Sequence, residues 1–291
     1  MEFHNPVLLK ETVDGLNIKE DGVYVDVTFG GGGHSREILK RLGKKGQLIA
    51  FDQDQDALLN TIIDSRFTLI NENFRYLKRF LRFHGVKKVD GILADFGVSS
   101  HQFDEADRGF SIRFDAKLDM RMNQQDKLSA FHVINEYDEV ALRKMFWEYG
   151  ELRQAPALAR TIVAERKNHQ IETTEQLKNV LKKYLPPRKE NKILAQIYQA
   201  IRIEVNQEIE ALKEFLTQVP ELLNPKGRLS FISYHSLEDR LVKRFIRSGM
   251  FEGEPEKDVF GNVEVPLKRI GKLIVPTHEE IKVNNRARSA K

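Results

Sequence analysis

The sequence predicts an α/β fold: a mostly parallel, twisted sheet with helices on both faces, and an all-α domain inserted into it. Three observations support this prediction. Short β-rich runs alternate with helical runs through the first hundred residues, a long stretch of helical patterns follows, and the next β-rich run comes only at 228–233. Strands separated by helices indicate right-handed crossovers, and these produce a parallel sheet.

The first hundred residues are expected to alternate strictly between strands and helices. Apolar, β-rich runs predict strands at 23–28, 47–52, 67–71 and 89–95. Helices are expected between them, in the run that ends at residues 42–43, at 55–63 and at 75–83. Each strand should therefore end at the same edge of the sheet, because successive crossovers return the chain to its starting edge.

A fifth strand is expected at 228–233 (RLSFIS), after a turn at 224–227 (NPKG). Ile209, Leu212 and Leu216 form the apolar stripe of the helix that should precede it. Three further elements are expected in the last part of the chain. They are a helix at 237–247, strand-like pieces at 252–278 and an exposed basic tail at 284–291.

The chain between the fourth and fifth strands is far longer than a crossover needs. Most of it has helical patterns, such as the amphipathic run 176–185, which is followed by two prolines. We therefore expect a helical domain at 106–205, inserted into a larger domain made of 1–105 and 206–291.

Composition excludes several classes of protein. The chain has 291 residues and no Cys, so disulfide scaffolds, thiolate metal sites and cysteine nucleophiles are excluded. No two of the 8 His lie within one helical turn, so no helix-borne zinc site is predicted and no metal is expected. No apolar run approaches the roughly 18 residues of a membrane span, and a cytoplasmic protein is expected. The net charge of +4 is compatible with a polyanionic partner without requiring one.

A run of four glycines, 30–33, follows the first strand and precedes a helix. Glycines let the backbone approach a ligand closely, and the N-terminus of the helix offers free N–H groups. Asp52 ends the second strand at about the 20-residue spacing typical of a carboxylate that binds an adenosine ribose. The alternatives are a packing turn for the glycines and a helix cap for Asp52. The combination favours an adenosine cofactor, without separating a nicotinamide dinucleotide from S-adenosylmethionine.

Asp95 ends the fourth strand, within the run DGILADFGVSS. Ligands of open parallel sheets bind beyond the carboxyl ends of the strands, near the point where the strand order reverses. Asp95 should therefore face the same crevice as the glycines. The alternative is a solvated aspartate that caps a turn.

Five motifs resemble the RsmH (MraW) family. They are VDVTFGGGGHS, DGILADFGVSS, RGFSIRFDAKLDMRM, YQAIRIEVNQE and FISYHSLEDRLVKRF, and they occur in family order along nearly the whole chain. The resemblance implies a Rossmann-like class I methyltransferase that uses S-adenosylmethionine. Its implied substrate is N4 of a cytidine in the decoding (P-site) region of 16S ribosomal RNA, and its implied partner is an assembled 30S subunit. The inserted domain would recognise the substrate RNA. The sequence leaves the oligomeric state open, a homodimer included.

The resemblance also implies roles for particular residues. Gly32, Gly33 and His34 would hold the methionine end of the cofactor, Asp52 the ribose and Phe74 the adenine. Asp95 and Gln102 would line the adenine and methionine region. Apart from the resemblance, the chemistry of the amine calls for a nearby hydrogen-bond acceptor, and the candidates are Asp95 or a backbone carbonyl of Phe96–Gly97. The chain departs from the family pattern in three places: at Gly31, in the stretch 151–159 and in the Asn-Asn-Arg of the tail.

Other side chains have two interpretations each. His235 could reach the base or could be a structural histidine at the rim, and Asp119 with Arg121 could order a loop or join neighbouring surfaces. Two basic clusters could follow phosphates, one at 75–88 and one at 178–192. A nicotinamide-dependent oxidoreductase, a non-catalytic ribosome-assembly factor and an amine methyltransferase acting on DNA or protein remain alternatives.

Overall fold

The structure is a computed structural model that describes residues 6–291. It divides into two compact units, Met1–Gly97 with Ile209–Lys291 and Val98–Glu208. We call them the sheet unit and the helical unit. The helical unit begins earlier than the expected 106, because the short helix α4 (Ser100–Asp104) and the η3 turn (Ala106–Arg108) belong to it.

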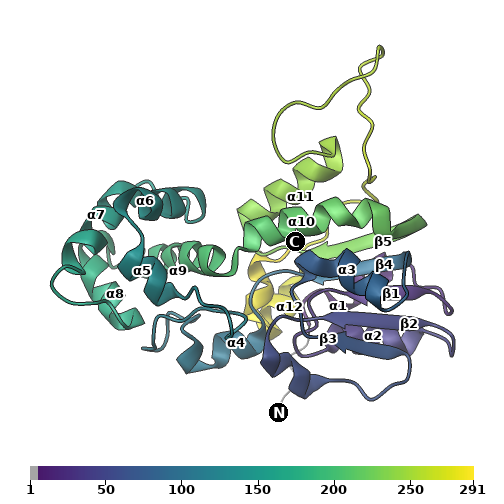
Figure 1. Cartoon of the computed structure of the whole chain (residues 1–291), viewed down its shortest axis with the longest axis horizontal. Helices are drawn as coiled ribbons and strands as arrows, with labels where there is room; N and C mark the ends of the chain where they lie inside the picture. The colour runs from purple at the N-terminus through teal and green to yellow at the C-terminus, as the bar shows by residue number, and fades with distance from the viewer. Residues whose placement is uncertain (1–5) are drawn as a thin grey trace. The chain divides into compact units, whose positions relative to one another are not determined.

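The sheet unit contains, within the described residues, a five-stranded sheet in the order β3-β2-β1-β4-β5 (Figure 1). Its strands are β1 (Val23–Asp26), β2 (Gln47–Phe51), β3 (Phe67–Ile70), β4 (Val89–Asp95) and β5 (Leu223–Ile232). Every neighbouring pair is parallel. The predicted α/β class is therefore confirmed, and all five strands end at one edge.

The two faces of the sheet are covered by different helices, since side chains alternate along each strand. Tyr24, Leu48 and Leu93 pack with α1 (Leu9–Gly15) and α2 (Gly33–Arg41). Their neighbours in sequence, Val25, Ile49 and Ile92, point to the other face. That face is covered by α3 (Leu77–Phe83), α10 (Glu208–Leu222) and α11 (Ser236–Ser248). Burial on both faces explains why these strands are almost continuously apolar.

The helical unit has an apolar core of its own. Its further helices are α5 (Ala130–Glu136), α6 (Glu139–Glu148), α7 (Ala155–Glu165), α8 (Thr174–Leu181), the η4 turn (Lys182–Tyr184) and α9 (Glu190–Asn206). Phe146, Leu158 and Ile197 are fully buried in this core. None of the helices between residues 6 and 291 combines the length and apolar character that a membrane span requires.

Two expectations about local structure are wrong. The expected helix at 55–63 is instead the 3-10 helix η1 (Gln55–Asn60), which begins at an Asp54 cap. The expected turn at 224–227 is an irregularity inside β5: Leu223 already pairs with Val89, and the register shifts before Gly91 pairs with Arg228. Lys226 has a φ of 68°, so the extra residues form a bulge and do not end the strand.

The C-terminal part also differs from the prediction. Residues 252–277 contain no helix or strand, because the glycines and prolines interrupt each apolar piece. The tail is only partly exposed: α12 (His278–Val283) leads into η5 (Asn285–Ser289), and Ala287 and Ala290 are buried, whereas Arg288, Ser289 and Lys291 are exposed. Ser233 and Lys291 exchange two backbone hydrogen bonds of 3.1 and 3.0 Å. These bonds dock the tail beside the end of β5, a contact between residues far apart in the sequence.

Candidate active site

The glycine turn joins β1 to the N-terminus of α2 at the carboxyl edge of the sheet. Gly32 has a φ of 75°, and a Cβ there would lie 2.8 Å from the ring of Phe29. A Cβ on Gly33 would lie 2.1 Å from Pro6 Cγ, whereas a Cβ on Gly31 would meet nothing within 4 Å. Gly32 and Gly33 are therefore required by the fold, and Gly31 borders open space. The first N–H groups of α2 have no partner within the helix and remain available to an anion.

Asp52 follows β2 and connects it to the glycine turn. Its Oδ2 accepts a 2.7 Å hydrogen bond from the Gly30 N–H, and its Oδ1 accepts a 2.9 Å bond from the Asp54 N–H. The Asn71 side chain donates to the Asp52 carbonyl at 2.8 Å. Burial raises the pKa of Asp52 to about 6, although the two N–H donors act in the opposite direction.

Asp95 is the last residue of β4, and both its backbone and its side chain are hydrogen-bonded. Its N–H donates to Thr28 Oγ1 at 2.6 Å, and the Tyr234 hydroxyl donates to its Oδ1 at 2.8 Å. Its side chain is 22% exposed. Burial raises the pKa of Asp95 to about 7, the Tyr234 hydrogen bond opposes this rise, and the negative charge of Glu238 adds to it.

Asp26 is a buried carboxylate that the sequence analysis did not single out. It ends β1, is completely inaccessible, and accepts hydrogen bonds from Ser35 Oγ at 2.7 Å and from the Thr28 N–H at 3.1 Å. Burial raises its pKa. The available signal was its place in VYVDVT, where a charged residue interrupts an apolar strand.

His34 lies between these groups in the first turn of α2. Its Nε2 is 3.2 Å from the Val7 carbonyl, an acceptor, so Nε2 carries the proton in the neutral ring. Its unprotonated Nδ1 then lies 3.9 Å from Asp95 Oδ2. Burial lowers the pKa of His34, which favours this neutral form.

The structure brings most of the predicted residues to the same edge of the sheet. The glycines, His34, Asp52 and Asp95 lie at or just beyond the ends of β1, β2 and β4. Phe74 begins the η2 turn (Phe74–Tyr76) after β3, where its ring centroid is 5.9 Å from that of Phe96. Gln102 belongs to the helical unit and forms a capping box with Ser99. Its predicted role remains a prediction.

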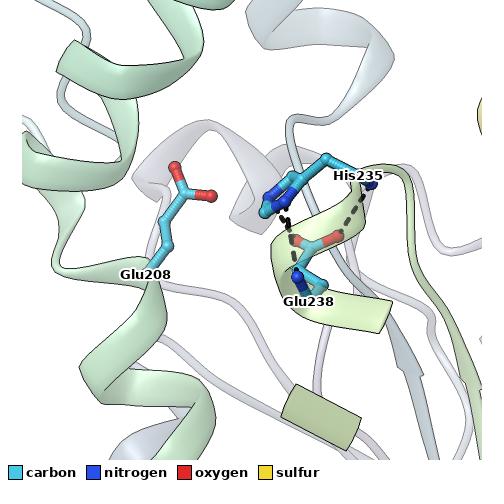
Figure 2. A group of neighbouring side chains, drawn as sticks. All are labelled: Glu208, His235 and Glu238. Carbon is cyan, nitrogen blue, oxygen red and sulfur yellow. Dashed lines mark hydrogen bonds and ion pairs between the residues drawn. The ribbon is translucent and has the colours of Figure 1, made fainter. Parts of the chain in front are cut away.

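His235 caps α11, as Figure 2 shows. Its Nδ1 accepts from the Glu238 N–H at 3.4 Å, and its Nε2 lies 3.1 Å from Glu238 Oε1. The N-cap of α11 is therefore His235, and the helix begins at Ser236, one residue before the expected 237. Both ring nitrogens face Glu238, which gives this histidine a structural function.

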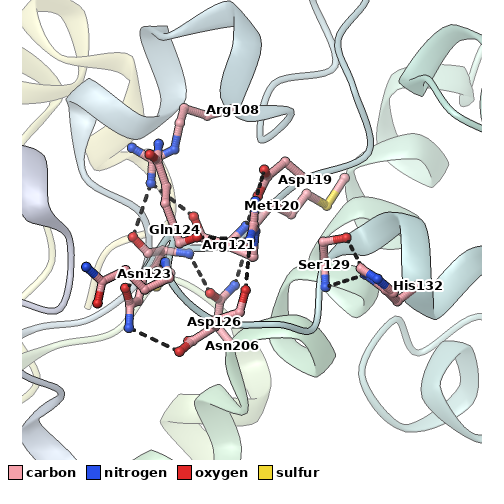
Figure 3. Close-up of polar contacts among 12 residues, drawn as sticks. Arg108, Asp119, Met120, Arg121, Asn123, Gln124, Asp126, Ser129, His132 and Asn206 are labelled. Atoms are coloured by element: carbon pink, nitrogen blue, oxygen red, sulfur yellow. Dashed lines mark hydrogen bonds and ion pairs between the residues drawn. The ribbon is translucent and has the colours of Figure 1, made fainter.

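Asp119 and Arg121 form a bidentate pair within one loop of the helical unit (Figure 3), with distances of 2.9 and 2.7 Å. Arg121 also donates to the carbonyls of Gln124 and Asp126. Asn206 accepts from the Met122 N–H at 2.7 Å and donates to the Met120 carbonyl at 2.8 Å. The pair therefore orders its own loop and does not join two surfaces.

The comparisons with known proteins agree with one another. The model of the MraW methylase family matches residues 1–291. The chain belongs to the MraW methylase family. Three relatives share the name Ribosomal RNA small subunit methyltransferase H. That of Christiangramia forsetii is 75% identical over 100% of this chain and 96% of its own length. That of Flavobacterium johnsoniae is 71% identical over 100% of this chain and 96% of its own length. That of Cytophaga hutchinsonii is 57% identical over 99% of this chain and 97% of its own length.

The predicted resemblance and the prediction of a methyltransferase are both confirmed by this family membership. It also argues against the nicotinamide-dependent oxidoreductase, which shared the glycine turn and the strand-end aspartate. The individual site residues of this methylase are a separate question, because family membership does not assign roles to them.

The raised pKa of Asp95 predicts a pH-dependent loss of stability that Asp95→Asn removes. The folded-state pKa of about 7 exceeds the ordinary aspartate value of 3.8, so folding opposes ionisation and the unsubstituted chain loses stability as the pH rises between these two values. As the pH rises from about 4 to about 7, the free energy of unfolding of Asp95→Asn should increase by up to about 4 kcal/mol relative to that of the unsubstituted chain. Urea denaturation at several pH values measures the difference.

Asp64→Asn is the matched control. Arg66 lowers the pKa of Asp64 to about 2, so Asp64 stays ionised throughout the same window and its contribution does not vary there. If the free energy of unfolding of Asp95→Asn differed from that of the unsubstituted chain by the same amount at every pH, the raised pKa of Asp95 would be contradicted.

Proposed function

We propose that this chain transfers a methyl group from S-adenosylmethionine to the exocyclic N4 of a cytidine in the decoding region of 16S ribosomal RNA, within an assembled 30S subunit. The observation that carries the proposal is the convergence of the glycine turn, Asp52 and Asp95 at one edge of the sheet in a member of the MraW methylase family. The shared name of the relatives supports small-subunit ribosomal RNA as the substrate.

The residues at this edge fit S-adenosylmethionine. Each Asp52 oxygen accepts one backbone N–H and keeps a lone pair for a ribose hydroxyl. The N–H groups of Gly33 and His34 lie at the start of α2, where the helix dipole favours the carboxylate of the methionine moiety. Phe74 offers part of its ring to the adenine, and the proposed role of Gln102 rests on the family resemblance alone. The cofactor supplies a methyl group on a sulfonium, which is strongly electrophilic.

Asp95 is the proposed catalytic residue. The lone pair of the cytosine amine is delocalised into the ring, so an acceptor for the amine hydrogens favours its localisation on N4. The N4–methyl bond would form as the sulfonium–methyl bond breaks, with the electron pair of the broken bond going to sulfur as a neutral thioether; N4 then carries the positive charge and must lose a proton. Asp95 takes that proton, and its pKa of about 7 suits an acceptor near neutral pH. The remaining acceleration comes from holding N4 about 3–3.5 Å from the methyl carbon.

The helical unit is the proposed site of RNA contact. In the sheet unit, three basic side chains of the cluster at 75–88 already contact other residues of that unit. Arg75 pairs with Glu214, Lys78 pairs with Glu221, and Lys88 donates to the Leu223 carbonyl. In the helical unit, the cluster at 178–192 has five exposed basic side chains, which are Lys182, Lys183, Arg188, Lys189 and Lys192. Exposed Lys and Arg side chains on one segment can contact successive phosphates of an RNA backbone.

The deciding experiment uses the purified chain, S-adenosylmethionine with a labelled methyl group, and small ribosomal subunits that lack the modification. Nucleosides digested from their 16S RNA are separated by mass spectrometry. We expect label in N4-methylated cytidine, and a much slower but measurable rate of labelling with Asp95→Asn. Label in another nucleoside or in protein would contradict the substrate assignment. Binding to the subunit without any label would favour the non-catalytic assembly factor.

Asp52→Ala should weaken cofactor binding. Each hydrogen bond between a ribose hydroxyl and a carboxylate contributes about 1.5–3 kcal/mol, so the Kd for S-adenosylmethionine should rise roughly tenfold to a hundredfold. Titration calorimetry measures the change, and Asp64→Asn serves as the control at a carboxylate of the same unit that is paired with Arg66. An unchanged Kd would remove Asp52 from the cofactor site.

Lys182→Ala with Lys183→Ala should weaken RNA binding and reduce its salt dependence. Loss of two phosphate contacts lowers the slope of log K against log salt by about 1.4–1.8. The measurement is fluorescence anisotropy with a single-stranded RNA at several salt concentrations. Arg79→Ala with Arg82→Ala is the matched control in the other cluster and should leave the slope unchanged. The reverse pattern would move the RNA contact to the sheet unit.

A further inference from the structure

The carboxylate of Asp95 has two unequal oxygens. Oδ1 accepts the Tyr234 hydroxyl at 2.8 Å. Oδ2 accepts no hydrogen bond from the residues that the structure describes, and the nearest ring nitrogen, His34 Nδ1, is 3.9 Å away. The backbone of Asp95 is fixed as well, since its N–H donates to Thr28 Oγ1. The side chain is thus held through one oxygen while the other remains available.

Tyr234 is itself held by the C-terminal segment. Its ring packs against a small apolar cluster in which Ile232, Ala287 and Ala290 are buried. The two backbone bonds between Ser233 and Lys291 fix the residue immediately before it. On the other side, a Cβ built on Gly97, which has a φ of 102°, would lie 3.4 Å from Tyr234 Cδ2, so the ring lies close to the chain that follows Asp95.

We propose that Tyr234 is the positioning residue for Asp95: its hydroxyl holds Oδ1, so that Oδ2 alone is presented to the cytosine amine. This inference rests on the proposed function, and it adds a residue that acts through Asp95 without touching the reacting atoms. The proton lost from N4 goes to Oδ2, and the Tyr234 hydroxyl keeps its own proton throughout. Tyr234 suits this role because burial and the charge of Asp95 raise the pKa of its phenol, so it remains a donor.

Tyr234 also affects the pH at which Asp95 can accept a proton. A donor to the carboxylate favours the ionised form. The titratable groups that face Asp95 are Asp26 on β1, His34 on α2, Tyr234 after β5 and Glu238 on α11. Only Tyr234 donates a hydrogen bond to the carboxylate among these, so its removal should raise the pKa of Asp95.

The test is Tyr234→Phe, assayed by transfer of labelled methyl groups to small ribosomal subunits that lack the modification. We expect kcat to fall about tenfold, the loss of one charge-assisted hydrogen bond. KM for both substrates should stay nearly constant, and the acid limb of the kcat profile should move to higher pH. In the Asp95→Asn background the same substitution should have no further effect on kcat, since Tyr234 acts through Asp95.

Tyr24→Phe is the matched control. It removes a buried phenol hydroxyl that accepts from the Lys19 N–H at 2.8 Å and makes no contact with Asp95, and it should leave the acid limb in place. A Tyr234→Phe profile with an unmoved acid limb, or an additive loss in the double variant, would overturn the inference and leave the proposed function standing. If the unsubstituted chain transfers no label to 16S RNA, the proposed function fails, and this inference fails with it.

Discussion

Parallel pairing of β1 with both β2 and β4 is the constraint on which the site depends. Because the strands run in one direction, their last residues meet at one edge, and each delivers a carboxylate there: Asp26 from β1, Asp52 after β2 and Asp95 from β4. The register is pinned by burial on both faces of the sheet. A slip of one residue would turn Val25 and Ile49 towards the opposite set of helices and would rotate the carboxylates with them.

This arrangement has an electrostatic cost. Three carboxylates with raised pKa values lie close together, and burial is the largest cause for each of them. The fold tolerates them because each carboxylate accepts hydrogen bonds: from Ser35 and Thr28, from Gly30 and Asp54, and from Tyr234. Perturbed carboxylates in one place are typical of a functional site, since a sheet built only for stability would gain from their removal.

The C-terminal segment positions the residues that follow β5, although its basic composition predicted an exposed tail. It is rich in Lys and Arg, yet Ala287 and Ala290 anchor it beside Ile232, and its backbone pairs with Ser233. It thereby fixes the chain on which Tyr234 and the His235 cap of α11 stand. The helical unit is independent in its packing, because it has a separate core and orders its long loop through Arg121 and Asn206.

The sequence by itself determined the strands β2 to β4, the glycine turn, and the positions of Asp52 and Asp95. These features depend on short-range patterns, and the parallel topology then implies that strand ends converge. The five motifs also identified the family, because they are long and occur in order.

Only the tertiary structure decided the partners of Asp95. Tyr234 is 139 residues away in the sequence, and nothing in the local pattern pairs the two residues. The bulge within β5 and the docked tail have the same origin. Each depends on a contact between distant segments, and such contacts form only when packing and hydrogen bonding select one arrangement of the whole chain.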